Sequence, residues 1–134
     1  MRKKRPEKPV SFHHSVGVSL RGIWYVIRTQ KHMQIHSALM SVSVVLGWWF
    51  HINRYEWMIL WLSIGAVLVA ESLNTAIEVA VDLTTKEYRI RAMVSKDVAA
   101  GAVVLAAIQS GIVGYLLFFD RLVTLISGGF PFGF

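Results

Sequence analysis

The sequence contains no cysteine and few charged side chains. The absence of cysteine excludes disulfide bonds, thiolate metal sites and cysteine nucleophiles. Charged residues make up 16% of the chain and hydrophobic residues 54%, whereas soluble domains average about 25% and about 45–50%. So few polar side chains cannot cover a compact soluble body, and the composition predicts a membrane protein. The net charge of +6 is compatible with nucleic acid or anionic lipid as a partner, and in so apolar a chain lipid is the better interpretation.

The N-terminus is basic, but it lacks the apolar run and the small-residue cleavage site of a signal peptide. We therefore expect insertion through internal apolar segments. Three of these, residues 33–52, 57–82 and 98–119, reach the length of about 20 mostly apolar residues that a membrane helix needs. A chain of 134 residues predicts one domain, here a membrane-embedded domain over 1–134.

The distribution of lysine and arginine predicts the orientation of the chain. Eight of the 14 basic residues precede the first span, and four lie between the second and third spans. Cytoplasmic loops carry the excess of Lys and Arg, which puts the N-terminus and the predicted loop 82–97 in the cytoplasm. Three spans also require these two regions to lie on the same side of the membrane.

Residues 11–28 differ from the three predicted spans because apolar and polar side chains alternate at helical spacing. The apolar positions are Phe12, Val16, Leu20, Ile23, Trp24 and Ile27. The pattern predicts an amphipathic helix, which either lies in the cytoplasmic interface or packs on the bundle. The two interpretations have equal weight.

Four polar residues of the second predicted span share one helix face. At about 100° per residue, Glu78 lies about 20° from Glu71, Asp82 about 20° to the other side, and Asn74 about 60° away. A carboxylate at the centre of a membrane helix costs at least about 2.5–3.5 kcal/mol and indicates function by default. None of the three predicted spans contains a Lys or Arg that could pair with these acids.

The residue types on this face narrow the chemistry. Carboxylate and amide oxygens suit Mg²⁺, which typically takes one or two carboxylates plus substrate phosphates, and a carboxylate can also act as a general base. The cations that follow the acidic face, at Lys86, Arg89, Arg91 and Lys96, could hold a polyphosphate. Together these groups fit phosphoryl transfer. However, no Walker A motif or kinase glycine-rich loop is present, and on spacing alone an ion or proton pathway fits nearly as well.

Four blocks of sequence resemble the prokaryotic diacylglycerol kinase and undecaprenol kinase family. They are Ala70–Glu78 (AESLNTAIE), Val81–Leu83 (VDL), Lys86–Tyr88 (KEY) and Ser95–Ala102 (SKDVAAGA). The resemblance extends over about residues 11–119. It implies a bacterial inner-membrane lipid kinase that uses ATP and Mg²⁺, with undecaprenol or diacylglycerol as substrate. It also implies a homotrimer of three-span subunits with an N-terminal surface helix, and active sites between subunits at the cytoplasmic interface.

The resemblance also suggests a role for each matching residue. Glu71 resembles the base that takes the proton from the lipid hydroxyl, and Glu78 resembles the Mg²⁺ ligand at the ATP phosphates. Asn74 resembles the amide that supports the site. The positions that match the nucleotide side are Asp82, Glu87, Lys96 and Asp97.

One position departs from the family pattern. Gln30 stands where the family has a second metal-binding glutamate. Its amide oxygen can ligate a metal but carries no charge.

His32 and His36 lie four residues apart, a spacing that can bind metal, but no third ligand is evident. We therefore expect them to be interfacial histidines, satisfied by lipid headgroups or by nearby glutamines.

Two other functions remain compatible with the acidic face: a proton or cation relay, and a non-catalytic membrane scaffold that has kept the fold. The loop discriminates against the relay, because a relay does not need Glu87, Lys96 and Asp97 beside the helix end, whereas a nucleotide site does.

Overall fold

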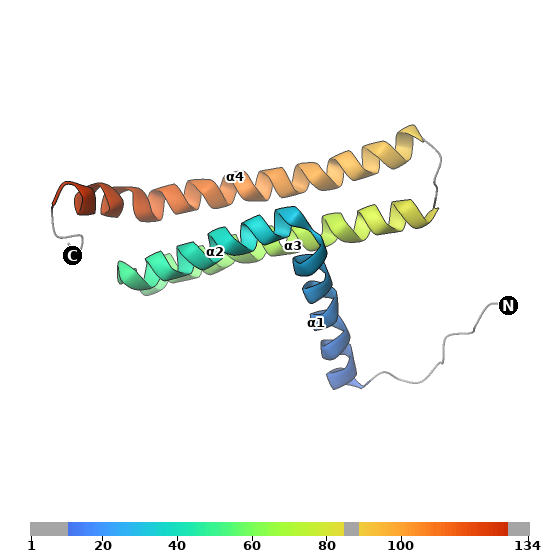
Figure 1. Cartoon of the computed structure of the whole chain (residues 1–134), viewed down its shortest axis with the longest axis horizontal. Helices are drawn as coiled ribbons and strands as arrows, with labels where there is room; N and C mark the ends of the chain where they lie inside the picture. The colour runs from blue at the N-terminus through green and yellow to red at the C-terminus, as the bar shows by residue number, and fades with distance from the viewer. Residues whose placement is uncertain (1–10, 85–88, 129–134) are drawn as a thin grey trace.

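The computed structural model describes residues 11–84 and 89–128, and within them the only regular secondary structure is α-helix. The helices are α1 (Phe12–Thr29), α2 (Lys31–Trp49), α3 (Arg54–Thr84) and α4 (Ile90–Ile126). The three longer helices, α2, α3 and α4, run side by side in an antiparallel bundle, and α1 leaves the bundle at a steep angle (Figure 1). The "α1 end" of the bundle is where α2 and α4 begin and α3 ends. The "turn end" is where a short turn joins α2 to α3.

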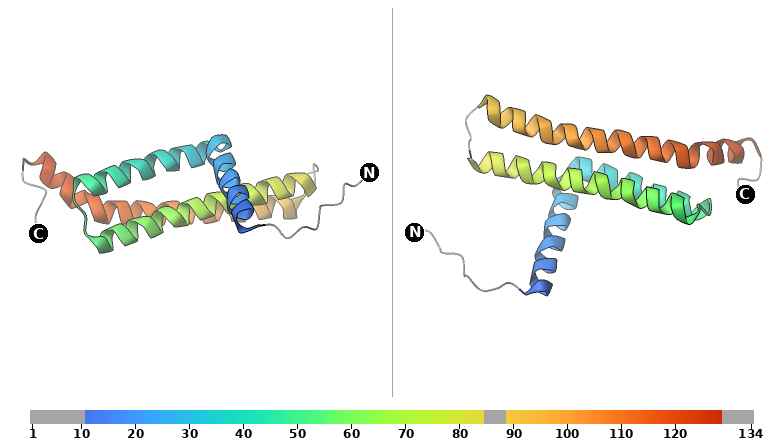
Figure 2. Two further views of the ribbon diagram at one scale, coloured as in Figure 1. Left: turned by 90° about the horizontal axis from the view of Figure 1, so that it is seen from below. Right: turned by 180° about the vertical axis from the view of Figure 1, so that it is seen from behind.

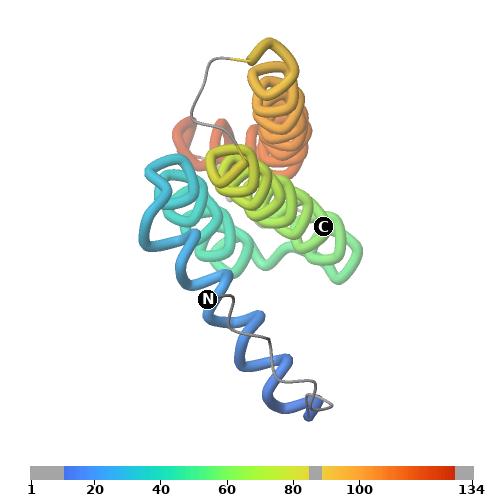
Figure 3. Tube along the Cα trace, turned by 90° about the vertical axis from the view of Figure 1, so that its right-hand side faces the viewer, coloured from blue at the N-terminus to red at the C-terminus, as the bar shows by residue number. Residues whose placement is uncertain are grey.

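Helix α1 covers the stretch that the sequence predicts to be helical. It contacts α2 and α3, but Val26 is its only buried residue. The rest of the helix projects from the bundle (Figures 2 and 3). Its large apolar side chains, including Phe12, Leu20 and Trp24, are exposed. Packing on the bundle is therefore confined to the C-terminal part of α1.

Helix α4 begins earlier than the sequence analysis expected. The interpretation of 82–97 as a loop is wrong, because α4 starts at Ile90 and includes both Lys96 and Asp97. The segment from Ile90 to Asp97 contains no Gly or Pro, the residues that most disfavour a helix interior. Lys96 and Asp97 thus project from a helix close to the end of α3.

Asn53 and Glu56 define the start of α3. The side-chain oxygen of Asn53 accepts hydrogen bonds from the backbone N–H groups of Tyr55 and Glu56, at 2.9 and 3.1 Å. In return Glu56 accepts the backbone N–H of Asn53 at 2.8 Å. This reciprocal capping satisfies donors that a helix start leaves without partners. Just before it, His51 adopts a positive φ of 51° in the turn from α2.

The buried apolar cluster lies towards the turn end. Its members are Phe50, Ile52, Leu60, Ile64, Leu117 and Phe118. Gly47 lets α2 approach this region closely, because a Cβ atom at this position would lie 3.0 Å from Ile52 Cδ1 and 3.1 Å from the Trp57 ring.

Beside the cluster, Arg121 Nη2 of α4 donates to both carboxylate oxygens of Glu56, at 2.9 and 3.0 Å. This partly buried pair joins the start of α3 to the last turns of α4.

Two of the described helices, α3 and α4, are long and apolar enough to cross a membrane. Helix α2 has 19 residues but is not among them, because its first turns carry Lys31, His32, Gln34 and His36. The outer faces of α3 and α4 expose large apolar side chains along their length, such as Leu62, Leu105 and Leu116. In water such faces would be unfavourable, and they suit a lipid environment.

Candidate active site

Glu71 is the most deeply buried member of the acidic face. Its side chain is only 3% exposed, although it is a carboxylate in the middle of an apolar helix. Thr75, one turn later, is also buried and donates its hydroxyl to the backbone carbonyl of Glu71 at 3.0 Å. That bond goes to the backbone and not to the carboxylate. Among the residues that the structure describes, Glu71 Oε1 is a buried oxygen without a hydrogen bond.

A titratable side chain of α2 lies close to this oxygen. His36 Nε2 lies 3.3 Å from Glu71 Oε1, within ion-pair distance, and the imidazole is 21% exposed. The two groups are within ion-pair distance but do not have the geometry of a hydrogen bond. The expectation that His36 is satisfied by headgroups or glutamines is wrong: it lies against the candidate base. Sequence spacing missed this contact because it joins two different helices.

Asn74 and Glu78 form the middle of the acidic face. Asn74 Nδ2 donates to Glu78 Oε1 at 3.0 Å, which fixes the carboxylate relative to the helix. Asn74 Oδ1 is buried and makes no hydrogen bond within the described part of the chain. A carboxylate and an unpartnered amide oxygen are thus held together one turn apart. These are the hard oxygen donors that Mg²⁺ prefers, so these two residues fit a magnesium ion.

Asp82 ends the acidic face and contacts α4. Its carboxylate accepts a hydrogen bond from Lys96 Nζ at 2.6 Å, with side-chain exposures of 65% for Asp82 and 37% for Lys96. The hydrogen bond to Asp82 raises the pKa of Lys96 above its ordinary value of 10.5, and the charge of Glu78 adds to the effect. Two residues that the sequence assigns to the nucleotide side therefore meet, and the lysine stays charged at neutral pH.

Burial decreases along α3 from Glu71 to Asp82, and the arrangement of the helices explains why. His36 is five residues from the start of α2, or about 7.5 Å at 1.5 Å per residue. Glu78 is seven residues beyond Glu71, about 10.5 Å along the antiparallel helix. Helix α2 therefore covers Glu71 but ends before the level of Glu78. Figure 1 shows α3 continuing past the start of α2 in this way.

The remaining candidate residues are less closely connected. Gln30 forms the junction between α1 and α2, where its backbone N–H donates to the Val26 carbonyl and its own carbonyl accepts the N–H of Gln34. Asp97 is exposed in the second turn of α4. Glu87 lies outside the described residues. Within residues 11–84 and 89–128, no group of three or more His, Asp or Glu side chains is placed to hold a metal. A magnesium site made of one or two carboxylates and completed by substrate phosphate would not need such a group.

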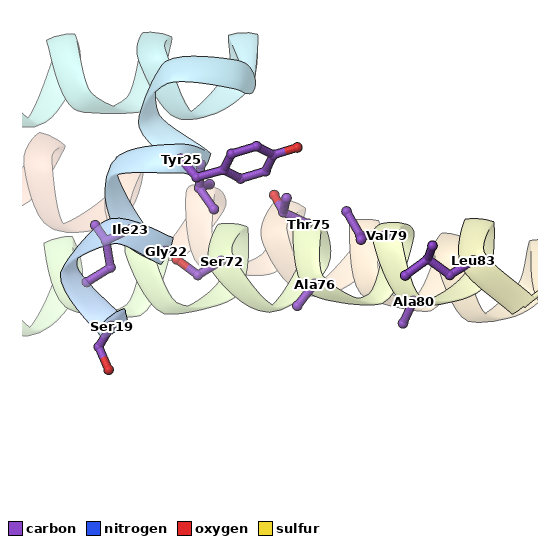
Figure 4. Close-up of a pocket in the computed structure, with 11 residues that line it drawn as sticks. Ser19, Gly22, Ile23, Tyr25, Ser72, Thr75, Ala76, Val79, Ala80 and Leu83 are labelled. Atoms are coloured by element: carbon purple, nitrogen blue, oxygen red, sulfur yellow. The ribbon is translucent and has the colours of Figure 1, made fainter. Parts of the chain in front are cut away.

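An apolar groove of about 560 Å³ lies between α1 and α3, and Glu71 is not among its lining residues. On α3 it extends from Ser72 to Leu83, so it starts one residue after Glu71. Figure 4 shows α1 crossing α3 there, with Thr75 and Val79 directed to the side on which Tyr25 lies. A second cleft, of about 520 Å³, separates the end of α3 from the start of α4 and is lined by Arg89 and Arg91. One cavity is apolar and the other is cationic, and both lie at the α1 end.

Comparison with known proteins gives consistent matches over most of the chain. The family described as Prokaryotic diacylglycerol kinase matches residues 17–118. An undecaprenol kinase of Bacillus subtilis (strain 168) is 42% identical over 102 residues, which cover 76% of this chain and 83% of the relative. A diacylglycerol kinase of Synechocystis sp. is 35% identical over 122 residues, 90% of this chain and 67% of the relative. A diacylglycerol kinase of Escherichia coli (strain K12) is 26% identical over 107 residues, which cover 80% of this chain and 88% of the relative.

Proposed function

The chain belongs to the prokaryotic diacylglycerol kinase family and is a membrane lipid kinase, and from this premise we propose that it transfers the γ-phosphoryl group of ATP to a lipid alcohol in a Mg²⁺-dependent reaction. The observation that carries the proposal is the buried carboxylate of Glu71, on the same helix face as Glu78 and Asp82. Family membership also favours this function over an ion relay or a non-catalytic scaffold.

Undecaprenol is the proposed lipid alcohol. The relative with 42% identity is named an undecaprenol kinase, whereas the relatives named diacylglycerol kinases are 35% and 26% identical. The apolar groove between α1 and α3 supports a long hydrocarbon substrate, since its lining on α3 begins at Ser72, the residue that follows Glu71. A lipid tail in this groove would bring its hydroxyl towards the buried carboxylate.

Glu71 is the proposed general base. A carboxylate shielded from water by α2 keeps its oxygen available for a substrate proton, because its backbone partner Thr75 does not occupy it. The lipid hydroxyl loses its proton to this carboxylate while the hydroxyl oxygen attacks the γ-phosphorus. The bond between the γ-phosphorus and the ADP oxygen breaks, and ADP leaves. A base of this kind typically contributes 10²–10⁴-fold to the rate.

Glu78 is the proposed ligand of the magnesium ion. Asn74 holds the Glu78 carboxylate in place through the 3.0 Å hydrogen bond. Carboxylate and amide oxygens are the ligand types that Mg²⁺ prefers, which supports this assignment. When bound, Mg²⁺ would neutralise charge on the ATP phosphates, and charge neutralisation together with positioning supplies most of the catalysis of phosphoryl transfer. Gln30 occupies the position of the family's second metal-binding glutamate, and it is proposed to act there as an uncharged ligand or a hydrogen-bond donor.

The nucleotide is proposed to bind at the α1 end beyond Glu78. Lys96 supplies a fixed cation there, oriented by Asp82, and Asp97 and Glu87 complete the nucleotide-side residues suggested by the family pattern. Arg89 and Arg91 line the cationic cleft at the same end of the bundle. Its lining contains neither Glu78 nor Asp82, so we assign to these arginines electrostatic attraction of ATP and no direct role in transfer.

The proposed setting is the bacterial inner membrane, with the N-terminus and the α1 end in the cytoplasm. Helix α2 would complete a three-span subunit, with its polar first turns at the membrane surface. The apolar side chains of α1 would then enter the interface, where an amphipathic helix buries one face. A homotrimer, suggested by the family pattern, would bury part of the apolar surface of α3 and α4.

The test is a comparison of lipid alcohols. The purified protein, reconstituted in vesicles, is incubated with labelled ATP and Mg²⁺ and with either undecaprenol or diacylglycerol. We expect label in the lipid phase with both components present, no label without Mg²⁺, and a higher kcat/KM for undecaprenol. No phosphorylation of either lipid would overturn the proposed kinase reaction, and a higher kcat/KM for diacylglycerol would overturn the choice of substrate.

A further inference from the structure

The buried oxygen of Glu71 has a neighbour that the proposed mechanism has not used. His36 Nε2 of α2 lies 3.3 Å from Glu71 Oε1, an oxygen without a hydrogen bond. A buried polar atom without a partner is costly, so a donor so close to it has a physical reason to be there. Catalytic hydrogen bonds are often long or poorly aligned before the substrate binds, and they tighten in the reacting complex.

The surroundings of His36 leave the imidazole room to align. The ring borders a cavity of about 280 Å³ between α2, α3 and α4. Two hydroxyl-bearing residues, Ser43 and Ser110, line the same cavity. On α3 the cavity is lined by Leu60, Ile64 and Val67, and Glu71 follows on the same helix face. The ring is thus bordered by the carboxylate and by a partly polar cavity, which leaves space beside the imidazole.

We infer that His36 is a positioning residue for Glu71, an inference that rests on the proposed kinase function. Nε2–H of the imidazole donates to Oε1 and fixes the orientation of the carboxylate. The second oxygen, Oε2, then faces the substrate and takes the proton of the lipid hydroxyl. His36 keeps its own proton throughout. The hydroxyl O–H bond breaks, an O–H bond to Glu71 forms, the lipid oxygen bonds to the γ-phosphorus, and ADP leaves.

The kinetic test compares three variants in the vesicle assay. His36→Leu removes the donor and His36→Gln keeps an amide donor at similar reach. His32→Leu is the matched control, because His32 is exposed one turn earlier on α2. Misplacing a reacting group by about 1 Å can cost about 10²-fold. We therefore expect His36→Leu to lower kcat by about 10- to 100-fold with KM for ATP unchanged. His36→Gln should recover most of the loss, and His32→Leu should match the wild type.

Failure of this inference differs from failure of the proposed function. If the wild type phosphorylates lipid and Glu71→Gln does not, while His36→Leu keeps the wild-type kcat, the positioning role is overturned. A loss in His36→Leu that His36→Gln does not recover also overturns it. If Glu71→Gln retains full turnover, the assignment of Glu71 as the base fails first.

A second measurement reads the position of the imidazole proton in the wild-type protein. With ¹⁵N-labelled histidine in the wild-type protein, the imidazole nitrogens report which of them carries the proton. We expect the His36 signal, assigned by its loss in His36→Gln, to show a proton on Nε2. A neutral ring protonated only on Nδ1 could not donate to Glu71 and would overturn the inference.

Discussion

Lys96 of α4 and Asp82 of α3 form an ion pair of 2.6 Å that joins the two helices at the α1 end of the bundle. The pair fixes the lysine two turns into α4, on a helix rather than in a flexible loop. Side chains on a helix keep their place with less motion than side chains on a loop. The proposed nucleotide site thus has one cation whose position is set by the same helix that carries Glu71 and Glu78.

Replacement of this cation should weaken ATP binding. Lys96→Met removes the cation that would donate a charge-assisted hydrogen bond to phosphate, and such bonds are roughly twice as strong as neutral ones. We expect KM for ATP to rise about tenfold or more, with KM for the lipid alcohol unchanged. Steady-state kinetics in vesicles measures both constants. Lys31→Met, an exposed lysine at the start of α2, is the control; an equal rise in KM for ATP in both variants would contradict a specific role for Lys96.

The uncharged side chain at position 30 should set the requirement for magnesium. Gln30→Glu adds a carboxylate at the junction of α1 and α2, where the family pattern has one. Carboxylates are preferred Mg²⁺ ligands, so we expect the half-saturating Mg²⁺ concentration to fall, with turnover at saturating Mg²⁺ at least as high as in the wild type. Activity is measured across a series of Mg²⁺ concentrations at constant ATP. An unchanged curve would place residue 30 outside the metal shell.

The ion pair between Glu56 and Arg121 should act on stability and not on catalysis. It is partly buried, with side-chain exposures of 20% and 27%, and it lies at the turn end, away from Glu71. Arg121→Met leaves Glu56 without this partner, and we expect the free energy of unfolding to fall by about 1–3 kcal/mol, between the values of exposed and buried pairs. Unfolding in detergent is followed by circular dichroism. A fall in kcat per folded molecule would contradict a purely structural role.

Gly47 should tolerate no larger side chain. A Cβ atom there would lie 3.0 Å from Ile52 and 3.1 Å from Trp57, and overpacking of this kind costs about 1–3 kcal/mol. We expect Gly47→Val to lower the unfolding midpoint. Gly17→Ala is the control, since a Cβ atom on Gly17 of α1 meets no atom within 4 Å. Equal midpoints for Gly47→Val and the wild type would mean that the contact is not close-packed.

The acidic face was predictable from sequence because it depends on one helix. The spacing of Glu71, Asn74, Glu78 and Asp82 follows from 3.6 residues per turn, and α3 is continuous through all four. The start of α4 was less predictable, since the charged stretch Ile90–Asp97 resembles a loop by composition although it has no helix breaker. Helix boundaries depend on tertiary context as well as on local propensity.

The contact between His36 and Glu71 could not be predicted from spacing. Which residue of α2 faces Glu71 depends on the length of the turn and on the packing of Gly47 against Ile52 and Trp57, and these set the register of the two helices. A useful signal was nevertheless present: a carboxylate in an apolar helix without Lys or Arg in the spans, and a histidine close to the matching end of the preceding helix.

The most direct test of the central claim, that Glu71 is the base for phosphoryl transfer to a lipid alcohol, is the turnover of Glu71→Gln in vesicles with undecaprenol, Mg²⁺ and labelled ATP. The control is Asp120→Asn, the same change of carboxylate to amide at an exposed position near the turn end. We predict that kcat falls about 10²-fold or more in Glu71→Gln, with KM for ATP unchanged, and that Asp120→Asn equals the wild type. Wild-type turnover by Glu71→Gln would contradict the account.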